Sequence, residues 1–161
     1  DNSRFRRYNQ AYQELSMSYN LFLDDIRKPE HAYIYPKRDG SGLIIDARSL
    51  KRCSGVDDAD WIVVRDYNSF VDTIEERGLP DVVSFDHDLH EEHINHYFNV
   101  TQDTGVIEYA NLKEKTGKHC AEVFIEKCKQ LQPQKLPDVY VHSANKYGAI
   151  EIKRVLEQLY D

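Results

Sequence analysis

The sequence predicts an α/β fold built on a doubly wound parallel sheet of four to five strands. Four short apolar runs are spread along the 161 residues, and stretches with helical spacing follow three of them. Strands that alternate with helices pair in parallel through right-handed crossovers. The runs also end in polar side chains, and α/β folds place their functional groups at the carboxyl ends of parallel strands.

The predicted strands are apolar on both faces, which is typical of strands buried in a parallel sheet. Each run is short and is bounded by charged, proline or glycine residues, as strands of this kind are. The strands are expected over residues 19–25, 61–65, 81–86 and 137–143.

Helices are predicted where apolar residues recur at spacings of three and four. The first lies in an N-terminal extension, residues 1–19, and we expect it to pack against the domain. Further helical stripes are expected over residues 67–74, 116–131 and 149–159. Two long insertions interrupt the pattern. Residues 31–60 are rich in turn residues, and residues 89–115 are polar and rich in histidine, which indicates a long loop with room for a small hairpin.

The composition indicates a single domain over residues 1–161 and excludes several classes of protein. With 40% hydrophobic residues the chain can bury a core, so it is not intrinsically disordered. The net charge, 21 − 28 = −7, argues against broad wrapping of DNA or RNA. No stretch approaches the roughly 18 apolar residues of a membrane helix, and the start lacks an apolar signal core. The three cysteines have no CxxC spacing, so we expect a cytoplasmic protein without a disulfide framework.

Acidic and histidine side chains follow the predicted strands. Asp24 and Asp25 end the first strand, Asp86 ends the third, and His142 lies at the end of the fourth. If the first and third strands are neighbours, three carboxylates converge, and their repulsion raises some pKa values unless a cation neutralises them. Oxygen ligands favour Mg²⁺, Mn²⁺ or Ca²⁺, and a histidine would admit a transition metal. The alternative, that these acids only cap helices or form turns, fits one strand end better than three.

The remaining histidines carry weaker signals. His90, His93 and His96 recur every three residues in a polar segment, and we expect them in a solvated loop. His119 opens a predicted helix, where it either faces an anion or lies on the helix surface.

Three segments carry the polar residues of the strand ends: LFLDDIRKP at 21–29, VSFDHDL at 83–89, and VHSAN at 141–145 followed by Gly148. Together they resemble the cyclic-phosphate-processing receiver-like (cREC) family, a divergent branch of the receiver fold of two-component signalling in bacteria and phages. The resemblance runs from about residue 20 to the end of the chain. It implies a receiver-like (flavodoxin-like) sheet.

The resemblance also implies a metal site. Asp24 and Asp25 match the acidic pair that holds a divalent cation, Mg²⁺ or Mn²⁺, and Asp86 matches the acid that joins them and accepts phosphoryl groups in true receivers. Ser143 matches the hydroxyl residue that contacts the phosphoryl group. True receivers carry a lysine after a fifth strand. This sequence ends with the helix after its fourth predicted strand, so we expect no ordinary phospho-relay.

By the same likeness we expect a metal-dependent phosphoesterase acting on cyclic phosphates, either RNA 2′,3′-cyclic phosphate ends or cyclic nucleotides. Hydrolysis needs a base for water and an acid for the leaving hydroxyl, and two histidines can supply both near neutral pH. We expect His87 and His142 in these roles, with Asp86 and Asp88 beside them. The substrate contacts are expected from Arg27, Ser143, Asn145 and His119.

Two other functions stay open. A non-enzymatic receiver-like module would bind a protein partner, for example as a phage protein acting on a host factor, and the negative charge, the tyrosines and the two insertions suit that role. The third is a signalling receiver phosphorylated on Asp86. The family's range implies the cytoplasm of a bacterial cell, with a phage gene as one source.

Overall fold

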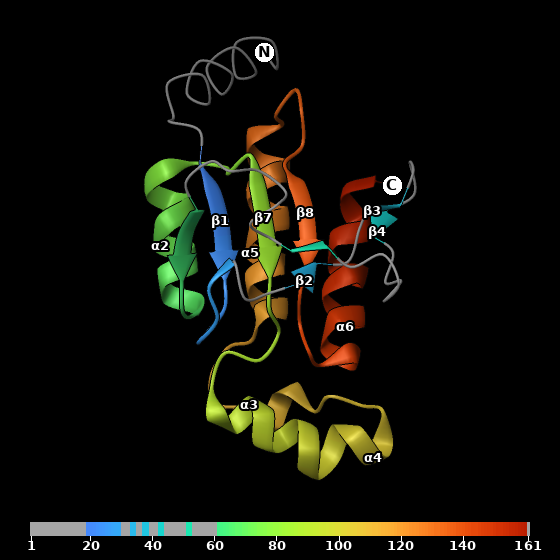
Figure 1. Ribbon diagram of the computed structural model, residues 1–161. Coiled ribbons are helices and arrows are strands. Elements are labelled where there is room, and N and C mark those ends of the chain that lie inside the picture. Colours follow the sequence, from blue (N-terminus) through green and yellow to red (C-terminus); the bar gives the residue numbers. More distant parts are fainter. Residues whose placement is uncertain are drawn as a thin grey trace.

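The structure, a computed structural model, describes residues 19–29 and 61–160 together with four short strands between these ranges (Figure 1). The four are β2 Tyr33–Ile34, β3 Lys37–Arg38, β4 Gly42–Leu43 and β5 Lys51–Arg52. β2 pairs with β5, and β3 with β4, both antiparallel. The predicted N-terminal helix and most of the insertion over 31–60 lie outside the described residues.

A sheet of four parallel strands confirms the predicted fold class. Its strands are β1 Asn20–Leu23, β6 Trp61–Val64, β7 Val82–Phe85 and β8 Asp138–Val141, in the order β6-β1-β7-β8. β1 and β7 are neighbours, and Leu23 is in register with Phe85. The residues that follow, Asp24 and Asp86, therefore leave the same edge of the sheet side by side.

Helices pack on one face of this sheet and form the core with it. They are α2 Tyr67–Arg77, α5 Gly117–Leu131 and α6 Lys146–Glu157, which the short helix η6 Gln158–Tyr160 extends. Because side chains alternate along a strand, Leu21 and Leu23 point to the helices, whereas Phe22 joins a smaller cluster with Trp61 on the other face. Within the described residues, no helix has the length and apolar character needed to cross a membrane.

The second insertion is helical, so the expected loop with a hairpin is wrong. It contains α3 Glu91–His96, the π-helical turn η4 Tyr97–Thr101, α4 Gln102–Thr104 and the 3₁₀ turn η5 Tyr109–Asn111. Figure 1 shows α3 and α4 beyond the carboxyl ends of the strands. The buried side chains of α3 and η4 are His93 and Thr101 rather than aliphatic residues, so no apolar stripe marks the helix in the sequence.

Candidate functional site

Three buried side chains meet at the carboxyl edge of the sheet, and we call them the acid cluster: Asp24, Asp86 and His142. They follow β1, β7 and β8, and one ligand atom of each lies within 4.8 Å of the others. Two carboxylate oxygens and one imidazole nitrogen are atoms that can bind a metal ion. The cluster could therefore hold one, with His142 where the sequence predicted Asp25.

Asp24 is held by its own turn. Its Oδ1 accepts from the backbone N–H groups of Ile26 (2.9 Å) and Arg27 (2.7 Å), and its Oδ2 accepts from Arg27 Nε at 2.8 Å. Burial alone would raise the pKa of Asp24, but the hydrogen bond from His142 and those from the two N–H groups outweigh it and hold that pKa well below its usual range. Asp24 is therefore an anion at neutral pH.

Asp86 has the opposite character. Its burial and the negative charge of Asp24 raise the pKa of Asp86 well above the usual value, although Arg27 opposes them. The Arg27 guanidinium reaches between the two acids, with Nη2 3.6 Å from Asp86 Oδ1. Asp25 is half-buried outside the acid cluster, and burial followed by the charge of Asp24 raises its pKa. Without a further cation the cluster holds one ionised carboxylate and one that readily keeps a proton.

His142 is buried and contacts Asp24. Its Nε2 is 3.0 Å from Asp24 Oδ2, its Nδ1 is 2.7 Å from Ser84 Oγ, and its ring stacks on Phe22 with centroids 4.4 Å apart. Burial lowers the pKa of His142, and the hydrogen bond with Asp24 opposes that effect. Both ring nitrogens are engaged within the protein, so this side chain is placed to orient Asp24.

A second group, the His87 array, adjoins the acid cluster and consists of His87, Asp88, Asn145 and Tyr109. His87 Nδ1 lies 2.6 Å from Asp88 Oδ1, and its Nε2 lies 2.9 Å from the Tyr109 hydroxyl. Asn145 Nδ2 donates to Asp88 Oδ1 at 3.2 Å. Burial raises the pKa of Tyr109, so its hydroxyl stays protonated and donates to Nε2. Sequence reasoning missed Tyr109, because an aromatic residue 22 positions after His87 in a polar segment carries no spacing signal.

Two glycines let helices approach this site closely. A Cβ on Gly148 would lie 2.3 Å from His87 Cγ, and one on Gly117 would lie 1.7 Å from the carbonyl oxygen of Asp86. The Gly117 N–H also donates to the His87 carbonyl at 2.8 Å. The first turn of α5 thus packs directly on the Asp86–His87 backbone, and the first turn of α6 packs on the His87 side chain.

The other residues expected at the site have partners within the protein. Ser143 Oγ accepts from the N–H of Asn145 at 3.1 Å, and Asn145 Oδ1 caps α6 by accepting from the N–H of Gly148. His119 Nδ1 accepts from the Thr116 N–H at 2.9 Å in a capping box at the start of α5. The structure thus brings Ser143 and Asn145 to the same strand end and places His119 in the first turn of α5, beside the Tyr109 ring.

The solvated-loop expectation is wrong for His93, which is buried. Its Nδ1 accepts from the N–H of Leu89 at 2.9 Å, and its Nε2 lies 2.9 Å from the Glu114 carbonyl, to which it donates. It thereby joins the two ends of the insertion. His90 and His96 are half-buried at the insertion's surface.

Comparison with known families places this geometry in context. Residues 19–158 match the family described as Cyclic-phosphate processing Receiver domain. No curated protein matches the chain, and no solved structure matches it.

Proposed function

The chain belongs to the family of cyclic-phosphate processing receiver domains, and from that premise we propose that it is a metal-dependent phosphoesterase that opens cyclic phosphates. RNA 2′,3′-cyclic phosphate ends and cyclic nucleotides are the two substrate types. The observation that carries the proposal is the acid cluster, in which Asp24 and Asp86 are buried within reach of a common ion. Arg27 can balance only one negative charge, and burying a second acid beside Asp24 is costly without a further cation, which supports a functional rather than a structural role.

Asp24 and Asp86 would hold the ion, Mg²⁺ or Mn²⁺. Asp25 is the third ligand expected for Mg²⁺, which prefers oxygen. His142 would be the third ligand for a softer metal, if its Nε2 exchanged the hydrogen bond to Asp24 for the ion. When bound, the ion supplies positive charge against the phosphoryl oxygens.

The chain's own groups perform the remaining tasks. Arg27 is partly exposed, with 32% of its side chain accessible, and its guanidinium can contact a phosphate oxygen. His87 Nε2 accepts from the Tyr109 hydroxyl, so Tyr109 would have to move aside before this nitrogen takes a proton from the attacking water as the new P–O bond forms. His87 would then return the proton to the sugar oxygen that leaves as the ring opens. Asp88 orients the His87 ring through Nδ1. We assign His142 to holding Asp24, because its Nε2 contacts that carboxylate at 3.0 Å.

The test combines thermal shift with turnover. Wild-type protein would be measured with Mg²⁺, Mn²⁺ or EDTA against 2′,3′-cyclic nucleotides, 3′,5′-cyclic nucleotides and an RNA ending in a cyclic phosphate. We expect metal-dependent turnover that falls at least about 100-fold in Asp86→Asn, which keeps the size of the side chain and the fold. Asp72→Asn, at an exposed position of α2, is the matched control. Turnover that is unchanged in EDTA, or retained in Asp86→Asn, would contradict the proposal.

A second candidate is a receiver-like module that binds a protein partner without catalysis. The specific observation is the exposed apolar surface of the second insertion, where Phe98 is 58% and Val106 56% accessible. This function predicts no turnover, partner affinity that survives Asp86→Asn, and affinity that is lost in Phe98→Ser.

A further inference from the structure

A cavity of about 460 Å³ opens between the end of the second insertion and the first turns of α5 and α6. This volume lies in the range of sites that hold small organic ligands. The side chains that matter for its chemistry are Tyr109, Lys118, Tyr147, Ile150, Glu151 and Arg154. None of the residues expected at the site from the sequence lines it.

The cavity walls combine flat apolar surface with charge. Tyr109 and Tyr147 contribute aromatic rings, and Ile150 is 41% exposed beside them. The Lys118 ammonium lies 4.3 Å from the centre of the Tyr109 ring, and Arg154 Nη1 lies 2.9 Å from Glu151 Oε1. Aromatic faces stack on nucleobases of any sequence, and a carboxylate can accept hydrogen bonds from sugar hydroxyls or base amino groups.

Tyr109 joins this cavity to the candidate site. Its hydroxyl is 2.9 Å from His87 Nε2, while its ring lines the cavity. The backbone N–H of His87 in turn donates to Asp86 Oδ1 at 2.9 Å. A continuous chain of contacts therefore runs from Asp86 through His87 and Tyr109 to the cavity. His87 itself is buried, so Tyr109 carries that chain to the open surface.

We infer that this cavity binds the nucleoside part of a nucleotide whose phosphate points toward Asp86, with the base stacked on Tyr147 and the ligand positioned by Tyr109. The direction of the phosphate rests on the proposed function, whereas the binding of the nucleoside rests on the cavity alone. A free mononucleotide and the terminal nucleotide of an RNA share this chemistry, and the experiment separates them.

Binding is measured by isothermal titration with adenosine 3′-monophosphate, with inorganic phosphate, and with a short RNA ending in a 3′-phosphate. None of these probes needs turnover. We expect the mononucleotide to bind at least tenfold tighter than phosphate. Tyr147→Ala should remove most of that difference while leaving the affinity for phosphate unchanged. Binding of the RNA alone, weakened by the same substitution, would support the inference with an RNA end as the source.

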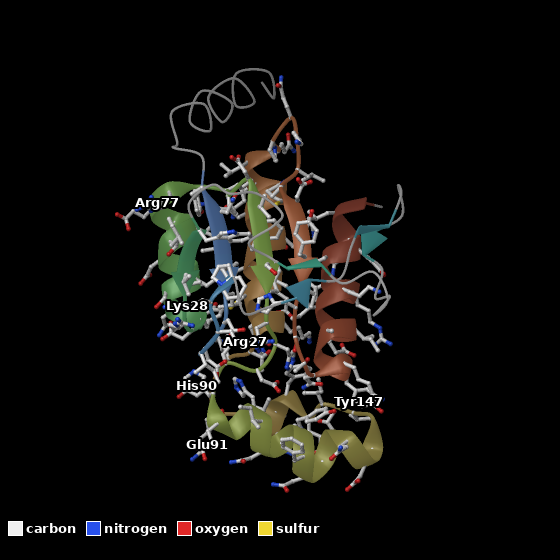
Figure 2. All side chains as sticks on the ribbon, in the orientation of Figure 1. Arg27, Lys28, Arg77, His90, Glu91 and Tyr147 are labelled. Atoms are coloured by element: carbon white, nitrogen blue, oxygen red, sulfur yellow. The ribbon has the colours of Figure 1, made fainter. Side chains whose placement is uncertain are left out.

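Two further variants test whether any loss of binding is caused by a change in the cavity or by unfolding of the protein. Ile150→Trp fills the cavity from an exposed position and should block the nucleotide. Arg154→Ala should weaken nucleotide binding several-fold. Arg77→Ala is its matched control, because Figure 2 shows Arg77 at the end of the molecule opposite Tyr147. Circular dichroism would verify the fold of each variant.

The outcomes separate the two proposals. Nucleotide binding that depends on Tyr147 and Ile150, with no turnover of any cyclic phosphate, would support the cavity as a nucleoside site and would contradict the proposed phosphoesterase activity. Metal-dependent turnover whose KM is unchanged in both Tyr147→Ala and Ile150→Trp would overturn the inference that the cavity binds the nucleoside. The proposed phosphoesterase activity would then be supported. The inference would also be overturned if the wild-type protein bound neither the mononucleotide nor the RNA more tightly than it binds phosphate.

Discussion

The acid cluster and the His87 array meet at Asp86 and His87, which are adjacent in the chain, yet the two groups differ in almost every property. The acid cluster comes from the ends of three strands, is buried, and is bridged by Arg27. The His87 array takes Tyr109 from the second insertion and borders an open cavity. The strand ends thus concentrate charge, whereas the insertion contributes the Tyr109 ring to the wall of an open cavity.

The largest expected effect is at the point where the two groups join. Gly117→Ala would place a Cβ 1.7 Å from the Asp86 carbonyl oxygen, and because that atom belongs to the backbone it cannot move aside cheaply. We expect a loss of about 3 kcal/mol in the free energy of unfolding, measured with urea. The control is Gly105→Ala, whose Cβ would meet the Tyr147 ring at 3.5 Å but at a φ of +72°. Its expected loss is about 1 kcal/mol, and a smaller loss for Gly117→Ala than for the control would contradict the close approach.

A substitution at His142 tests whether the acid cluster is closed to water. His142→Phe keeps a flat ring against Phe22 but removes the hydrogen bonds to Asp24 and Ser84. Because Asp24 is left buried with one partner fewer, we expect a loss of about 2 kcal/mol in EDTA. His90→Phe, at the half-exposed start of α3, should change stability little. An unchanged unfolding midpoint for His142→Phe would show that Asp24 does not depend on it.

The corresponding change in the His87 array should cost less. Tyr109→Phe removes one hydroxyl, keeps the ring beside Lys118, and leaves His87 Nε2, rather than a carboxylate, without its partner. We expect a loss of about 1 kcal/mol or less. Tyr97→Phe, in the same insertion, is the control. A loss for Tyr109→Phe as large as that for His142→Phe would erase the contrast between an open and a closed group.

The mildest test uses pH. Burial lowers the pKa of His93 below its ordinary 6.5; the Glu114 carbonyl and Asp88 raise it, and His87 and His90 lower it further. Below about pH 6.5 the unfolded chain therefore binds more protons at His93 than the folded protein does. The contribution of buried, neutral His93 to the free energy of unfolding is complete above that pH and is lost as the pH falls through the folded-state pKa of His93.

Hydrogen exchange would locate this loss. After division by the intrinsic rate of base-catalysed exchange at each pH, amides of 89–115 should be less protected at pH 5.5 than at pH 7.5, by a larger factor than those of β1 and β7. His93→Gln should reduce that dependence, and His96→Gln should not. An equal loss of protection across the sheet and the insertion would contradict a local role for His93.

Much of the candidate site follows from chain order. Apolar runs that alternate with helices predict a parallel sheet, and in such a sheet residues that directly follow neighbouring strands must lie together. Asp24, Asp86 and His142 were predicted on that ground, and the structure brings them within 4.8 Å of one another. Asp25 shared the motif but not the position, because successive side chains at a strand end point in different directions.

The sequence by itself thus determined the parallel sheet and the side chains at its edge, since covalent adjacency to a strand also sets position in space. Only the tertiary structure decided the contacts of the insertion. His93 is polar in sequence but buried between Leu89 and Glu114, and Tyr109 reaches His87 across 22 residues. Such contacts depend on how a helical segment folds back over the strand ends, and no local periodicity records that path.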